Sequence, residues 1–158
     1  MEVDPVGHMA HRLSHAVTML CELIPYTNDV SLPAVISIAC LEDWFTNYRL
    51  VIEFLVLKPP ANCASAQDFV PGWKARPEVK ARLARDYGWA SEDVSHIGRP
   101  QKPAPERGAY DPPALRAKAE QLLSDLEEFV AALAVVGHDY EDLVRVALTI
   151  CRTKLGSQ

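Results

Sequence analysis

Apolar residues recur at every third or fourth position along several stretches of this chain, as they do on the buried face of an amphipathic helix. The stretch over residues 33–57 is apolar around so much of the helix circumference that we expect it to be the central helix. No segment alternates apolar and polar residues as a half-buried strand would. The pattern predicts long helices over about 9–25, 33–57, 112–136 and 139–151, and short helices over 77–87 and 91–97.

Prolines and glycines mark the connections between these stretches. Residues 59–76 are predicted to be an irregular loop that packs onto the core, because they include Phe69 and Trp73. Gly88 is expected to end the first short helix. Residues 98–113 are rich in proline and glycine and are expected to be extended or turn-rich. The fold class predicted is all-α, an up-and-down bundle of three or four main helices plus short helices.

The chain has 158 residues, which is the size of one domain. Gly7-His8-Met9 is typical of the residues that a cloning site leaves before a native methionine. We therefore expect residues 1–8 to be such a remnant or a disordered leader, and residues 9–155 to form a single helical-bundle domain.

Charge and cysteine content narrow the classes of partner and compartment. The net charge of −5 argues against broad electrostatic binding to nucleic acid or to anionic membranes. The four cysteines form no CxxC pair, and no apolar run is long and uncharged enough to cross a membrane. We expect a cytoplasmic protein that binds no membrane, with no cofactor and no metal. A local basic excess remains in the middle of the chain, at Arg76, Lys80, Arg82, Arg85, Arg99 and Lys102.

The long central helix carries charged and amide side chains within an apolar stretch. Arg49 and Glu53 stand four residues apart, and Glu42 lies two turns before Arg49, on the same side of the helix. One interpretation is a half-buried ion pair that fixes the helix register. The other is an arginine that presents its guanidinium to a phosphate, with Glu42 and Asn47 beside it in the binding site.

His96 is the histidine with the most basic surroundings, since Arg85 precedes it and Arg99 follows it. A histidine titrates near neutral pH, so it could act as a general acid or base while the two arginines hold a phosphate. The alternative is a histidine hydrogen-bonded to a backbone carbonyl or to a carboxylate of the bundle.

Three segments together resemble small uncharacterised bacterial helical proteins that are similar to HEPN domains. They are Leu41-Glu42-Asp43-Trp44-Phe45-Thr46-Asn47-Tyr48-Arg49-Leu50-Val51-Ile52-Glu53-Phe54-Leu55, Ser65-Ala66-Gln67-Asp68-Phe69-Val70-Pro71-Gly72-Trp73 and Ser91-Glu92-Asp93-Val94-Ser95-His96-Ile97.

The resemblance implies a helical bundle that commonly dimerises and that either cuts RNA without a metal, often in toxin–antitoxin or defence systems, or binds it. Arg49 and His96 match the related proteins and are the candidate catalytic residues. Active members carry an arginine four to six residues before a histidine. Here Arg85 precedes His96 by eleven residues, and Asn47 stands where histidine is usual.

Three functional hypotheses follow. The first is a non-enzymatic helical interaction module, as a homodimer or with a protein partner, in which Glu42, Arg49, Asp68 and His96 form a buried polar network. In that case an exposed apolar face of the first or last helix packs on the partner. The second is a HEPN-type RNA-binding protein or ribonuclease. The third is a small-molecule-binding bundle with a pocket lined by Trp44, Tyr48, Trp73 and Trp89.

Overall fold

The structure, a computed structural model, describes residues 4–57, 63–94 and 111–156, of which residues 92–94 are described by their backbone alone. These residues form helices and connections and include no strand, which confirms the all-α prediction. The helices are α1 (Pro5–Glu22), α2 (Ala34–Val56), α3 (Ala66–Phe69), α4 (Pro77–Val94), α5 (Pro112–Val136) and α6 (Glu141–Gly156), with a 3₁₀ turn η1 (Ile24–Tyr26) after α1.

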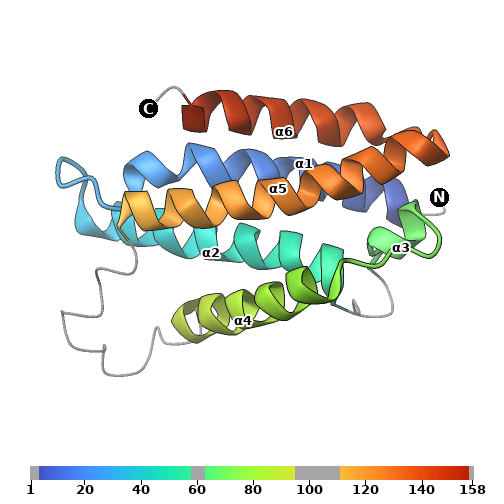
Figure 1. The fold of residues 1–158 in the computed structure, drawn as a ribbon. Helices are drawn as coiled ribbons and strands as arrows, with labels where there is room; N and C mark the ends of the chain where they lie inside the picture. The colour runs from blue at the N-terminus through green and yellow to red at the C-terminus, as the bar shows by residue number, and fades with distance from the viewer. Residues whose placement is uncertain (1–3, 58–62, 95–110, 157–158) are drawn as a thin grey trace.

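The five long helices lie side by side (Figure 1). The most extensive contacts pair α1 with α6, α2 with α4, and α1 with α2, and α5 packs on α6. In Figure 1, α6 and α4 lie on opposite sides of the bundle, with α1, α5 and α2 between them. Helix α2 therefore belongs to the centre of the fold, as its apolar circumference predicts.

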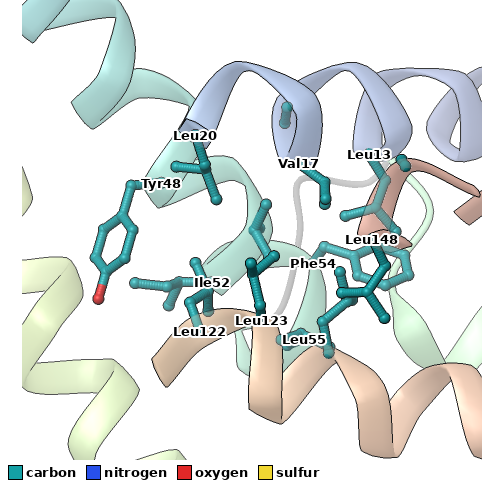
Figure 2. Packing of buried hydrophobic residues seen from close by; sticks show 14 of the residues in the cluster. Leu13, Val17, Leu20, Tyr48, Ile52, Phe54, Leu55, Leu122, Leu123 and Leu148 are labelled. Atoms are coloured by element: carbon teal, nitrogen blue, oxygen red, sulfur yellow. The ribbon is translucent and has the colours of Figure 1, made fainter. Parts of the chain in front are cut away.

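The core is built from the facing sides of α1, α2, α5 and α6. In Figure 2, two leucines and Val17 of α1 meet Ile52 and Phe54 of α2 and the paired Leu122 and Leu123 of α5. All of these side chains are buried. The ring of Tyr48 lies at the edge of this cluster, beside α4 (Figure 2).

Helix α1 begins earlier than the apolar pattern predicts. Asp4 caps it by accepting a hydrogen bond from the Val6 amide at 3.0 Å, and Pro5 occupies its first turn. The Tyr140 hydroxyl donates to Asp4 at 2.8 Å, and Gly7 is buried against both side chains. Residues 5–8, expected to lie outside the bundle, are thus part of its first helix.

The two short helices predicted on either side of Gly88 form one continuous helix, α4. A glycine inside a helix costs about 1 kcal/mol relative to alanine. Packing beyond Gly88 offsets that cost, because Ala90 is fully buried and the ring of Trp89 lies 5.1 Å from that of Phe45 on α2. The predicted break at Gly88 is therefore wrong.

The connection before α4 packs down as expected, but it contains a helical turn that the pattern missed. Ser65 and Asp68 form a capping box that starts α3. Trp73 donates to the Leu55 carbonyl oxygen at 3.3 Å and contacts Phe129 edge to face. Helix α5 has the bounds that the pattern predicts: Asp111 accepts from the Ala114 amide at its start, and Gly137, with a positive φ of 64°, ends it.

Candidate functional site

The largest group of polar side chains lies between α2, α4 and α5 and is centred on Asp86. One carboxylate oxygen of Asp86 accepts a hydrogen bond from the Tyr48 hydroxyl at 3.0 Å, and the other accepts from the Lys118 ammonium at 2.6 Å. Arg82 lies one turn before Asp86, at 3.7 Å, and also forms a close ion pair with Asp125. We call Tyr48, Arg82, Asp86, Lys118 and Asp125 the interhelical network.

The network balances two buried carboxylates with two cations. Asp86 and Asp125 are almost fully buried, whereas Arg82 and Lys118 reach the surface. Burial raises the pKa of Asp125, and the hydrogen bond and charge of Arg82 oppose that rise. Burial and the charge of Asp86 raise the pKa of Tyr48 far above its usual value. These effects favour the neutral phenol, which donates its hydrogen bond to Asp86 and so connects α2 to α4.

Arg49 belongs to a second polar group, between α2 and α4. Its guanidinium lies 5.1 Å from the centre of the Tyr87 ring and donates to the Tyr87 hydroxyl at 3.2 Å. That hydroxyl in turn donates to Glu53 at 2.7 Å, and Arg49 and Glu53 are 3.8 Å apart. Arg49 and Glu53 thus form the ion pair that their spacing indicates, with Tyr87 as an unforeseen bridge, and the phosphate-binding role of Arg49 stays a prediction.

The remaining candidate residues do not gather around Arg49. Asn47 is buried and donates to the Asp43 carbonyl oxygen of its own helix at 2.8 Å. Glu42 is half-buried, and its carboxylate bonds to none of the described side chains. Arg85 is exposed on α4. His96 and Arg99 lie outside the described residues, so the pairing of Arg49 with His96 remains a prediction.

The polar network predicted from the sequence is wrong for Asp68, whereas a contact between Glu42 and His96 stays a prediction because His96 lies outside the described residues. The Asp68 carboxylate accepts hydrogen bonds from the Ser65 amide at 2.6 Å and from the Ser65 hydroxyl at 2.8 Å. Asp68 therefore caps α3 and does not pair with Arg49. Glu42 joins no network among the described residues. The buried carboxylates Asp86 and Asp125, which bridge α4 to α2 and α5, were not singled out by the sequence.

The four aromatics expected to line one pocket belong to two separate clusters. Trp44 stacks on Tyr48 with ring centres 4.9 Å apart, and Trp89 contacts both edge to face. Trp73 instead joins the cluster around Phe129. Trp44 and Tyr48 are fully buried, and rings that pack on each other in this way form core.

A different feature stands out at the start of α2, where apolar side chains face solvent. Val35, Ile36 and Ile38 are 69%, 45% and 52% exposed, and Val30 in the preceding turn is 98% exposed. Tyr26 of η1 is also about half exposed. We call Tyr26, Val30, Val35, Ile36 and Ile38 the α2 apolar surface. The exposed apolar face expected on the first or last helix is absent from α1, where His8, His11, Arg12 and His15 occupy the solvent side. On α6, Val146 and Ile150 stand four residues apart and are 56% and 41% exposed.

Two signals in the sequence could have indicated the interhelical network and the α2 apolar surface. Asp125 interrupts the apolar stripe of α5 between Leu122 and Leu126, and a carboxylate in such a position needs a cation. The second signal is the absence of charge between Asp29 and Glu42. The start of α2 lies at the end of the bundle, where solvent-facing residues are usually charged or polar (Figure 1). Helical periodicity alone assigns Val35 and Ile38 to the core, where they do not lie.

Comparisons with protein-family models, with curated proteins and with solved structures each found no match to this chain. Among the described residues, no helix combines the length and apolar character that a membrane span needs. The described residues also bring together no group of three or more histidines, cysteines or carboxylates that could hold a metal ion.

Proposed function

We propose that this protein is a non-enzymatic helical interaction module that self-associates through the α2 apolar surface. The observation that carries the proposal is the exposure of Val35, Ile36 and Ile38 on a helix whose second half is the core of the bundle. Contiguous apolar side chains on a monomer surface mark interaction sites, whereas scattered single ones do not.

A second copy of the chain is the occupant that the chemistry favours. From Val30 to Leu41 the chain has no charged residue, so this surface offers nothing to select a partner of opposite charge. A neutral apolar face is complementary to itself, and a two-fold interface places the same surface on both subunits. Crossing of the two α2 segments would bury Val35 and Ile38 of each copy against the other.

The size of the surface fits a dimer interface of modest area. Five large side chains that are about half or more exposed amount to an area on the order of 500 Å² per copy. Exposed Ala34 and Ala39 and half-buried Leu32 extend the same surface. A standard interface buries ~800 Å² per partner. The α2 apolar surface with its margins approaches that size.

The polar groups support a structural role in preference to catalysis. In the interhelical network each cation faces a carboxylate of another residue, and the Tyr48 phenol stays protonated. Arg49 is likewise held by Tyr87 and Glu53. These cations are held by a carboxylate or a phenol of a neighbouring helix, an arrangement that fixes helix register, while Arg49 Nε and Arg82 Nη1 are buried without a hydrogen-bond partner among the described residues.

The test is the oligomeric state of wild type, Val35→Glu and Val146→Glu, measured by sedimentation equilibrium over a range of concentrations. Val146 lies on α6, is 56% exposed and gives a control with the same added charge. We expect the wild type and Val146→Glu to dimerise and Val35→Glu to be monomeric, with Kd raised at least tenfold. Circular dichroism melts establish that all three fold. A monomeric wild type, or dissociation by Val146→Glu alone, would refute the proposal.

A further inference from the structure

Two buried cysteines face each other across the most extensive helix pair of the bundle. Cys21 lies in the last turn of α1 and Cys151 on α6, and both are almost fully buried. Their side chains interact, and this interaction shifts the pKa of both thiols. The other two cysteines, Cys40 and Cys63, are half-buried on α2 and in the turn before α3.

An independent contact fixes the register of the two helices at this point. The Lys154 ammonium forms a close ion pair with Glu22. Glu22 is adjacent to Cys21 in the chain, and Lys154 follows Cys151 by three residues, which is about one helical turn. The same alignment that joins Lys154 to Glu22 therefore brings the two sulfur atoms together.

We propose that Cys21 and Cys151 are a redox-sensitive pair that forms an intramolecular disulfide between α1 and α6 when the protein meets hydrogen peroxide. The Cys21 thiolate attacks one peroxide oxygen, the O–O bond breaks, and the products are a sulfenic acid and hydroxide. The Cys151 thiol then attacks the sulfenic sulfur, the S–S bond forms, and water leaves. Two thiols lose two electrons and two protons, and one peroxide becomes two waters.

The surroundings assign different roles to the two thiols. The interaction with Cys151 lowers the pKa of Cys21, burial and the charge of Glu22 oppose this decrease, and the Lys154 ammonium adds to it. The interaction with Cys21 and burial raise the pKa of Cys151. We assign Cys21 as the attacking thiol because Lys154 is ion-paired with its neighbour Glu22, and Cys151 as the resolving thiol. The neutral Cys21 thiol also donates to the Thr18 carbonyl oxygen at 3.0 Å.

The consequence is a covalent link between the first and last helices. A disulfide that closes so long a loop removes much of the conformational freedom of the unfolded chain. The reduced pair behaves as ordinary apolar core, and oxidation converts it into a brace between α1 and α6. This inference is independent of the proposed self-association, since neither cysteine lies on the α2 apolar surface.

The test treats the full chain with hydrogen peroxide and maps its disulfides by mass spectrometry of a non-reduced digest. We expect a Cys21–Cys151 linked peptide, a melting temperature raised by about 10 °C, and reversal of both by dithiothreitol. Cys40→Ser and Cys63→Ser should keep the increase, and Cys151→Ala should lose it. Disulfides that contain Cys40 or Cys63 instead, or a Cys21 that oxidises to sulfinic acid without a link, would overturn the proposal. The digest of the wild type decides the matter even if Cys151→Ala fails to fold.

Discussion

The Tyr48 hydroxyl donates to Asp86 at 3.0 Å, so a single side chain joins the apolar core to the interhelical network. The Tyr48 ring is fully buried and stacks on Trp44, whose indole N–H donates to the Leu20 carbonyl oxygen at 2.9 Å. Helix α1 is thereby connected through Trp44 and Tyr48 of α2 to Asp86 of α4. Loss of one polar contact in this series should affect the register of several helices.

Tyr48→Phe should change how stability depends on pH at the alkaline end. The pKa of Tyr48 in the folded protein is raised far above the unfolded value of 10.0. The contribution of Tyr48 to the free energy of unfolding is therefore complete below its unfolded pKa and decreases as pH rises above that value. The unfolded wild type releases a proton that the folded state keeps, so its free energy of unfolding should fall by about 1.4 kcal/mol per pH unit above pH 10.

Urea unfolding between pH 8 and 11 measures this slope. Tyr48→Phe should cost about 1 kcal/mol at pH 8 for the lost hydrogen bond to Asp86 and then lose less stability than the wild type at higher pH. Equal slopes for wild type and Tyr48→Phe would mean that the buried phenol ionises freely.

Arg82→Ala should be strongly destabilising because it leaves Asp125 buried without its cation. Asp125 is 5% exposed, and removal of one partner of a buried ion pair costs about 3–5 kcal/mol. Arg82 is itself 25% exposed, so we expect about 3 kcal/mol, at the lower end of that range. Arg85→Ala is the matched control on the same helix and should stay within about 0.5 kcal/mol of wild type. Equal losses in the two variants, by urea unfolding, would contradict the role given to Asp125.

Arg49→Ala should cost about 1 kcal/mol, because Glu53 is 39% exposed and surface ion pairs contribute little. Under the proposed function, neither wild type nor Arg49→Ala cleaves total RNA in metal-free buffer, and electrophoresis of the RNA measures this. His96→Ala is the companion variant for the HEPN resemblance. Cleavage by wild type that vanishes in a well-folded His96→Ala would refute the non-enzymatic proposal in favour of a ribonuclease.

Much of the fold follows from local signals, and the deviations follow from packing. The caps at Asp111 and Gly137 set the ends of α5 where the pattern predicts them. Gly88 is a local signal that contacts across the bundle override, since Trp89 and Ala90 hold the helix together beyond it. Such contacts between residues far apart in the chain are invisible to a periodic pattern.

The candidate site was harder to predict than the fold for a related reason. The pairing of Arg49 with Glu53 is local and could be predicted from its four-residue spacing. Asp125 and Arg82 are 43 residues apart, and their pairing depends on how α4 and α5 come together. The α2 apolar surface escaped prediction because periodicity says which face of a helix is apolar, and not where neighbouring helices end.

Two glycine variants should move stability in opposite directions and so test α4 and the end of α5. Gly88→Ala should raise the free energy of unfolding by about 0.5–1 kcal/mol, because alanine restricts the unfolded chain and favours helix. An added Cβ at Gly88 meets no atom within 4 Å. Gly137→Ala should lower the free energy of unfolding by about 1 kcal/mol, because the φ of +64° at this position strains any residue that has a Cβ. The space around Gly137 is as open as that around Gly88. Urea unfolding of both variants gives the two values. A destabilised Gly88→Ala would indicate that α4 breaks at that position, as the sequence alone predicts.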